Sequence, residues 1–180
     1  MCIRDRFNGE IKMKTIKPDE INSYIGKEIG VSEWVTIDQE MINKFADATL
    51  DHQFIHVDPE QAKPIFGSTV AHGFLTLSLT AGIPFSQEGL GLVLEGTKMG
   101  LNYGLDKVRF LSPVPVNSEV RLKIKCNDIT EKNPGQFLLK NEVTMEIKGV
   151  EKPAYIAETL SMFVTSVSYT HLRAHETSLH

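Results

Sequence analysis

The chain has 180 residues, of which 41% are apolar and 23% charged, a mixture typical of one compact domain and not of a disordered or fibrous protein. Its formal net charge of −4 offers no basic surface to a phosphate backbone, so we expect no nucleic-acid partner. The longest apolar-rich stretch, residues 69–85, contains a histidine and several hydroxyls and is too short to span a membrane. No signal peptide is visible, and the two cysteines exclude a disulfide scaffold, so we expect a cytoplasmic protein.

The two ends of the chain differ from its middle. Residues 1–12 (MCIRDRFNGEIK) show neither helical nor strand periodicity, and residues 166–180 (SVSYTHLRAHETSLH) form a polar run. Both ends resemble translated sequencing adapter, and Met13 would be a natural start. We therefore predict a single domain over residues 13–165, with non-native or disordered segments at 1–12 and 166–180.

The first half of this domain is mainly helical in pattern. A short helix is expected to begin at Pro18, and residues 28–36 alternate as in a strand. Either Thr36 or Asp38 can cap a helix with one apolar face, formed by Met41, Ile42, Phe45 and Ala46.

The next segment contains a loop and two further helices. Residues 51–59 have the composition of a loop, which a short helix follows until Pro64 ends it. Residues 70–84 are apolar around most of a helical circumference, which predicts a helix buried on nearly all sides.

The second half alternates with the period of strands. Four strands are predicted, at residues 108–111, 119–129, 136–147 and 154–164. Turn residues at 133–135 and 148–149 separate the last three. Helices followed by a meander of antiparallel strands define an α+β fold, and the apolar helix at 70–84 is the obvious cover for the sheet.

Two short polar motifs are the candidates for chemistry. The first is D-H-Q-F-I-H, from Asp51 to His56, and the second is V-A-H-G, from Val70 to Gly73, which opens the apolar helix. An acid and an imidazole five residues apart in a loop can converge on one water molecule, as general acid–base catalysis requires. Glycine at a helix start lets backbone N–H groups approach a ligand oxygen on which negative charge develops.

Each residue of the two motifs also has a structural interpretation. Asp51 could cap a loop, His56 could be a hydrogen-bonded loop histidine, and Gly73 could simply allow close helix packing. A zinc site from Asp51, His56 and His72 lacks a recurrent ligand spacing, so we predict no metal. His52 is expected to face solvent. It is the combination of acid, base and helix start in one short stretch that favours a catalytic site.

The runs F-A-D-A-T-L-D-H-Q-F-I-H-V-D-P-E-Q-A (45–62) and P-I-F-G-S-T-V-A-H-G-F-L-T-L-S-L (64–79) resemble the MaoC-like dehydratase family, which includes the (R)-specific enoyl-CoA hydratases, and within it the nodulation-protein-N-like branch. The resemblance implies a single hot-dog fold, in which a long antiparallel sheet wraps a central helix. It also implies a homodimer, an acyl-CoA substrate and no cofactor.

The resemblance further implies roles for individual residues. Asp51 and His56 match the family's catalytic acid and histidine, and Gly73 and His72 are the expected substrate-binding residues, with the backbone N–H of Gly73 binding the thioester carbonyl. Gln53 and Phe54 stand where many hydratases have asparagine and proline, and Ala81 stands where some have serine.

The implied reaction is the reversible hydration of a trans-2-enoyl-CoA to an (R)-3-hydroxyacyl-CoA, a step of fatty acid metabolism. Two alternatives remain open at the level of sequence. A hot-dog thioesterase would direct water at the thioester carbonyl instead of at Cβ, and a non-catalytic module would bind acyl-CoA without turnover.

Overall fold

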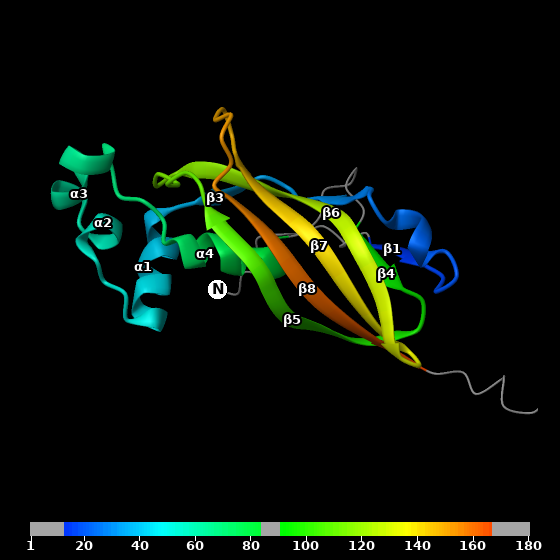
Figure 1. The fold of residues 1–180 in the computed structure, drawn as a ribbon. Helices are drawn as coiled ribbons and strands as arrows, with labels where there is room; N and C mark the ends of the chain where they lie inside the picture. Colours follow the sequence, from blue (N-terminus) through cyan, green and yellow to red (C-terminus); the bar gives the residue numbers. More distant parts are fainter. Residues whose placement is uncertain (1–12, 84–90, 167–180) are drawn as a thin grey trace, which may run out of the picture.

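A computed structural model of the chain describes residues 13–83 and 91–166. The predicted end segments at 1–12 and, after Ser166, at 167–180 lie outside the described residues, as does the end of the predicted helix at Pro84. Within these bounds the chain has the predicted α+β architecture, a long antiparallel sheet with few helices (Figure 1).

The main sheet has six strands, in which β2, β6, β7, β8 and β5 lie side by side in that order and β3 pairs with β6. All its pairs are antiparallel. The strands are β2 (Glu28–Val31), β3 (Val35–Ile37), β5 (Thr97–Phe110), β6 (Ser118–Asn133), β7 (Gln136–Ile147) and β8 (Tyr155–Thr165). A separate parallel pair joins β1 (Met13–Ile16) to β4 (Gly91–Leu94).

Period-two alternation explains the best-predicted strand, β7, whose bounds match the prediction residue for residue. Its odd-numbered residues are buried and its even-numbered residues are half-exposed. β5 begins eleven residues before its predicted start at 108. The predicted strand at 28–36 is divided into β2 and β3, because the buried Ser32 places its Oγ 2.7 Å from the backbone nitrogen of Leu122, from which it accepts a hydrogen bond.

The first long helix, α1 (Gln39–Thr49), follows the prediction. Asp38 is its N-cap, and Oδ1 of Asp38 accepts a hydrogen bond from the backbone N–H of Met41 at 2.8 Å. Ile42 and Ala46 are buried on its apolar face. The helix ends at Leu50, which adopts a left-handed conformation with φ 64° and so turns the chain toward the first polar motif.

Two short helices correct the prediction for the next segment. The predicted loop at 51–59 contains α2 (Phe54–Val57), and α3 (Pro59–Phe66) continues through Pro64 instead of ending there. Pro64 lies near the C-terminal end of α3, where the lost N–H removes only one hydrogen bond. Gly67 ends α3 with φ 79°, and its N–H donates to the carbonyl oxygen of Lys63 at 2.9 Å.

The central helix is shorter than predicted. It consists of α4 (Gly73–Ser78), followed by a turn of 3-10 helix, η3 (Leu79–Ala81); another 3-10 turn, η2 (Ile21–Tyr24), forms near the predicted first helix. Residues 70 and 71 stay extended because they bond to the backbone at 114–116. Phe74 is 68% exposed, so this helix is not buried on all sides within one chain.

The main core lies between α4 and the inner face of the sheet. It contains Leu75 from α4 and Tyr155 from β8, whose hydroxyl lies 2.7 Å from Oγ1 of Thr80. Its buried aliphatic residues come from several elements: Ile37, Ile42, Val114, Val120, Leu122, Val143, Met145 and Ile147. Among the described residues, no helix is long and apolar enough to cross a membrane.

Candidate active site

The two polar motifs meet where the helices adjoin the start of α4. Figure 1 shows α1, α2 and α3 gathered beyond one end of the strands, beside α4. Asp51 follows the left-handed end of α1, His56 lies in α2, and His72 immediately precedes α4. Asp51 is half-exposed, whereas both histidines are buried. The structure therefore brings the sequence-predicted residues together.

The three side chains are in close contact. A carboxylate oxygen of Asp51 and one ring nitrogen each of His56 and His72 lie within 4.8 Å of one another. The two imidazole rings are stacked, with centroids 3.7 Å apart and planes inclined by 25°. The ring of Phe45, from the predicted apolar face of α1, lies 5.1 Å from His72. The Asp51 carboxylate thus lies beside two stacked imidazoles, and the apolar ring of Phe45 packs against one of them, His72.

Backbone carbonyls fix the tautomers of both histidines. Nδ1 of His56 lies 2.7 Å from the carbonyl oxygen of Val70, and Nε2 of His72 lies 2.9 Å from the carbonyl oxygen of Asp51. A carbonyl oxygen only accepts, so each of these nitrogens must carry the proton. In the neutral rings, Nε2 of His56 and Nδ1 of His72 are then unprotonated. Nδ1 of His72 is buried and has no hydrogen-bond partner within residues 13–83 and 91–166.

Burial keeps His56 neutral near pH 7. The pKa of His56 is lowered from 6.5, chiefly because burial disfavours the charged imidazolium. The adjacent His72 lowers it further, whereas the hydrogen bond to Val70 and the charge of Asp51 oppose the shift. A neutral His56 with a free Nε2 lone pair can accept a proton, which is the property a general base needs.

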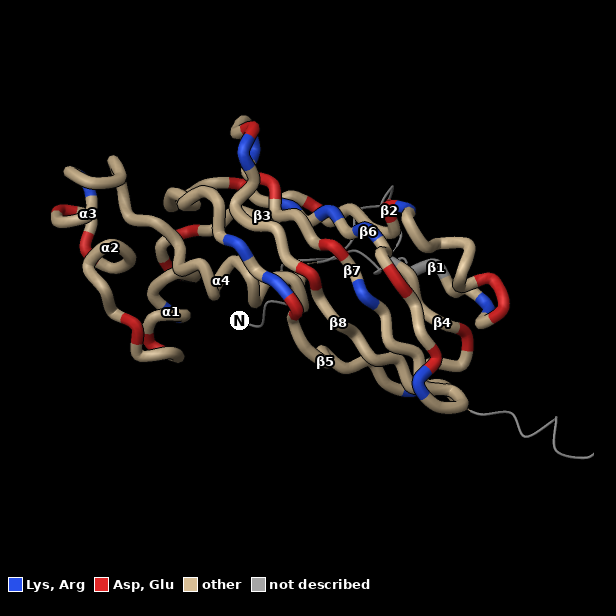
Figure 2. Tube along the Cα trace, viewed as in Figure 1, with Lys and Arg blue, Asp and Glu red and all other residues tan. Residues whose placement is uncertain are grey.

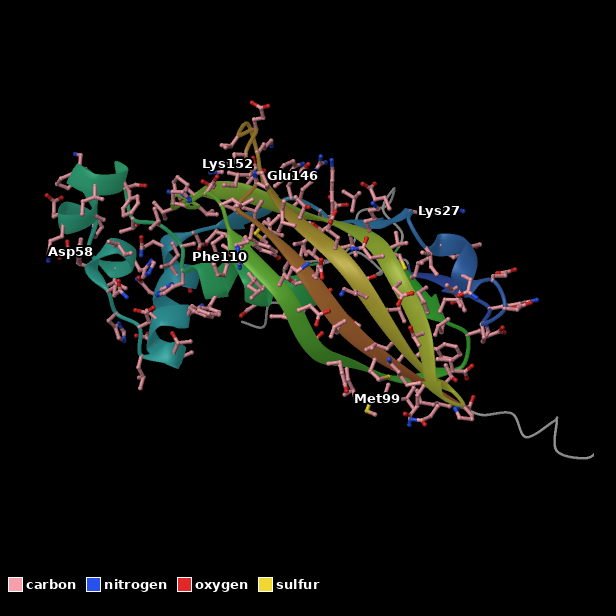
Figure 3. All side chains as sticks on the ribbon, in the orientation of Figure 1. Lys27, Asp58, Met99, Phe110, Glu146 and Lys152 are labelled. Atoms are coloured by element: carbon pink, nitrogen blue, oxygen red, sulfur yellow. The ribbon has the colours of Figure 1, made fainter. Side chains whose placement is uncertain are left out.

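Gly73 occupies the first position of α4. The first N–H groups of a helix have no partner within it, so the N–H of Gly73 can serve a ligand oxygen. A Cβ at this position would lie 3.1–3.2 Å from three ring carbons of Phe110. Figure 3 shows Phe110 on β5 close to α4. The predicted alternative, that glycine permits close packing, is therefore also part of its role.

The remaining residues of the first motif lie outside the cluster. The side chain of His52 is 51% exposed and faces Asp47 at 3.6 Å, which confirms that it faces solvent. The carbonyl oxygen of Gln53 accepts the N–H of His56 at 2.9 Å, and Phe54 is exposed. The two departures from the hydratase pattern thus lie at the start of α2 and not among the stacked rings.

Sequence reasoning missed two residues that brace the site. Nε2 of Gln39 donates to the carbonyl oxygen of His56 at 2.7 Å, and Oε1 of Gln39 accepts from the hydroxyl of Thr69 at 2.5 Å. Gln39 begins α1, 17 residues before His56, so no local spacing could have shown the contact. The polar pair ties α1, α2 and the segment before α4 into one unit.

The geometry also bears on the metal alternative. A zinc ion bound by both imidazoles would lie about 2.0–2.1 Å from each ligating nitrogen, close to each ring plane. Two rings stacked at 3.7 Å put any shared point far out of at least one plane, where there is no lone pair. The stacking therefore favours proton chemistry for this cluster over metal binding.

A long antiparallel sheet over a short apolar helix, with an acid and histidines at the start of that helix, defines a hot-dog domain of the hydratase type. The chain belongs to the MaoC-like dehydratase family, a family of hydro-lyases, because the model of the MaoC-like domain matches residues 20–147.

Curated relatives place it in the nodulation-protein-N-like branch. The chain is 48% identical to nodulation protein N of Rhizobium leguminosarum bv. viciae over 145 residues, which cover 79% of this chain and 88% of the relative. It is 46% identical to 3-hydroxyacyl-thioester dehydratase Z of Mycobacterium tuberculosis over 140 residues, which cover 77% and 90%.

Solved structures confirm the fold. A monoamine oxidase regulatory protein from Archaeoglobus fulgius superimposes with a TM-score of 0.70 at 23% identity, over 87% of this chain and 99% of that one. The (R)-hydratase from A. caviae involved in PHA biosynthesis superimposes with a TM-score of 0.57 at 19% identity, over 76% and 94%.

Proposed function

We propose that this protein catalyses the reversible hydration of trans-2-enoyl-CoA to (R)-3-hydroxyacyl-CoA, with Asp51 and His56 as the catalytic residues. The observation that carries the proposal is the fixed tautomer of His56: its Nδ1–H donates to the carbonyl oxygen of Val70, which leaves the lone pair on Nε2, and a nitrogen of this ring lies within 4.8 Å of an Asp51 carboxylate oxygen. The family and the dehydratase relative support the same class of reaction.

In the proposed mechanism, one water molecule donates its two hydrogens to Nε2 of His56 and to the Asp51 carboxylate. His56 takes a proton as the water oxygen attacks Cβ, and the resulting imidazolium gives that proton to Cα on the same face. The OH and H of one water are thus added across the double bond. Negative charge on the thioester oxygen is stabilised by the N–H of Gly73, and losing one such donor typically costs about 100- to 1,000-fold in rate.

His72 is assigned to positioning. Its Nε2–H is engaged by the carbonyl oxygen of Asp51, and its ring supports that of His56. Its Nδ1, unprotonated in the neutral ring, has no hydrogen to donate to a thioester oxygen. The expectation that His72 binds substrate directly stays a prediction, and the oxyanion role belongs to Gly73 in this scheme.

The proposal includes a homodimer with its contact along β5. Among the described strands β5 lies at the sheet edge, and exposed edges readily pair with another chain. It has no charged residue between Lys98 and Asp106, a stretch drawn in tan in Figure 2. Exposed apolar side chains follow this strand: Met99, Leu101, Tyr103, Leu105 and Phe110; Figure 3 labels the first and last. The exposed Phe74 of α4 lies 5.8 Å from Phe110.

The catalytic proposal is tested by following crotonyl-CoA with the full chain, through loss of the conjugated enone absorbance and, in parallel, release of free thiol. We expect hydration without thiol release, and a loss of about 100- to 10,000-fold in Asp51→Asn and in His56→Ala. The matched controls are Asp47→Asn and His52→Ala, which make the same substitutions at exposed neighbours and should retain activity. Thiol release would instead identify a thioesterase, and full activity of either site variant would refute the site.

The homodimer is tested by light scattering on the full chain and on Leu101→Lys. We expect twice the chain mass for the wild type and a shift toward the monomer for the variant, since a lysine would be buried in a paired edge. Thr144→Lys, on the opposite face of β7 from the core, is the control and should stay dimeric. A monomeric wild type would refute the dimer.

A further inference from the structure

A cavity of about 670 Å³ lies at the C-terminal end of the central helix, within the size range of small-molecule sites. Leu77, Thr80 and Ala81 border it on the helical side, and residues of β5, β7 and β8 border it on the sheet side. None of the described residues that line it is charged. The cavity thus suits a neutral ligand.

One wall of this cavity contains a buried amide where the pattern of β7 calls for an apolar side chain. Asn141 lies between Leu139 and Val143 on the inner face of β7, is 8% exposed, and borders the cavity. Its Oδ1 is buried and has no hydrogen-bond partner among the residues that the structure describes. Burying an amide oxygen without a partner destabilises the fold, and leucine, of similar volume, would avoid this cost.

Neighbouring strands add further polar groups to the same wall. Thr159 of β8 is the cross-strand partner of Asn141, and Ser161 is the partner of Leu139. Asn102 of β5 is paired with Ser161. All four polar residues line the cavity, and Thr159 and Ser161 are half-buried. The polar groups therefore form one patch inside an otherwise apolar cavity, which fixes where a polar atom of a ligand would sit.

The helix connects this patch with the candidate active site. Gly73 begins α4, Leu77 follows one turn later, and Ala81 follows after another turn. With a rise of about 1.5 Å per residue, the cavity begins roughly 6 Å along the helix from the thioester site. An acyl chain held by its carbonyl at Gly73 and extended along α4 would reach the cavity with its distal part.

We propose that the cavity binds the distal part of an acyl chain that bears a hydroxyl group, and that the hydroxyl donates its hydrogen to Oδ1 of Asn141. This proposal rests on the proposed function and specifies its substrate class. Thr159 and Ser161 supply further hydrogen-bonding groups beside the same hydroxyl. A plain alkyl chain would leave Asn141 unpaired and would be bound less well.

The test compares trans-2-enoyl-CoA thioesters of about six to twelve carbons with a terminal hydroxyl against their unsubstituted counterparts, using the full chain. At the length that places the hydroxyl at Asn141, we expect kcat/KM to favour the hydroxylated member by about five- to tenfold, as for one buried neutral hydrogen bond. Asn141→Leu should abolish this preference and raise Tm, because it removes the buried amide oxygen that has no partner.

A second pair of variants controls for folding. Thr159→Val removes a hydroxyl from the cavity wall and should reduce the preference, whereas Thr144→Val makes the same change on the outer face of β7 and should not. A wild-type enzyme that prefers the unsubstituted chain at every length would overturn the proposal. So would a preference that persists in Asn141→Leu.

Failure of the proposed function is recognised separately, by absence of crotonyl-CoA turnover in the wild type. In that case the same thioesters are titrated calorimetrically into the wild type and into Asn141→Leu. Tighter binding of a hydroxylated member, lost in the variant, would still support the cavity assignment. Equal binding of the two series would overturn it.

Discussion

The contact between the start of α4 and the ring of Phe110 predicts the effect of Gly73→Ala. The new Cβ would lie 3.1–3.2 Å from three ring carbons, whereas ordinary carbon contacts lie at about 3.5–4.0 Å. Ring or helix must therefore move by roughly 0.3–0.9 Å to restore an ordinary contact. Overpacking of this kind costs about 1–3 kcal/mol, and replacing a helical glycine by alanine returns about 0.5–1 kcal/mol.

The net expectation for Gly73→Ala is a loss of up to about 2.5 kcal/mol in unfolding free energy and a decrease of up to roughly 10 °C in Tm. Because the helix start is displaced relative to Asp51 and His56, kcat should fall by up to about 100-fold. Thermal denaturation and crotonyl-CoA hydration measure the two effects.

A double-mutant cycle isolates the contact. Phe110→Ala removes the ring, so Gly73→Ala should cost neither stability nor turnover when it is made in the Phe110→Ala background. Phe110 is 46% exposed, which limits the cost of that background variant. If Gly73→Ala is equally damaging with and without the ring, the packing argument is wrong.

Three further predictions follow from other contacts of the described residues. The pKa of His56 is lowered from 6.5 by burial, so kcat/KM should be constant above about pH 6.5 and fall tenfold per pH unit below the lowered pKa. Between pH 6.5 and the lowered pKa the unfolded chain binds a proton that the folded chain does not, so the unfolding free energy should decrease as the pH falls through this window and level off below it. Alkaline loss without acid loss in the pH–rate profile would contradict this. Asp38→Ala removes the cap on the N–H of Met41 and should lower the unfolding free energy, measured by chemical denaturation, by about 1 kcal/mol while kcat/KM stays unaffected. An unchanged denaturation midpoint would show the cap to be dispensable. Burial raises the pKa of Tyr155 to about 12, so Tyr155→Phe should remove a late-titrating tyrosine from the ultraviolet pH titration. Because the variant also loses the hydrogen bond to Thr80, its unfolding free energy should decrease by about 1 kcal/mol. An unaltered titration above pH 11 would be inconsistent with that burial.

The parts of the fold that sequence predicts are those determined by local periodicity. β7 is predicted residue for residue because strict alternation and the turn before it, where Gly135 adopts φ 76°, define both its face and its start. The helix capped by Asp38 follows for the same reason. Pro64 misled the prediction of α3, because the rule that proline ends helices weakens in the last turn.

The site could be predicted in composition but not in geometry. An acid, a histidine and a helix start within one stretch pointed to Asp51, His56 and Gly73. The stacking of His56 on His72 depends on the direction that the chain takes after the left-handed residue Leu50. The hydrogen bond from Gln39 to the carbonyl oxygen of His56 joins residues that are 17 positions apart. Neither leaves a periodic signal, since both result from tertiary packing of separate helices.

The tautomers at this site depend on carbonyl oxygens of Val70 and Asp51, and therefore on the path of the main chain. Any residue at position 70 that keeps this path presents the same acceptor to His56. The side chain at position 70 therefore does not determine which nitrogen of each imidazole carries the proton. Because Val70 is itself buried, a substitution there would alter the local packing without resetting which nitrogen of His56 acts as the base.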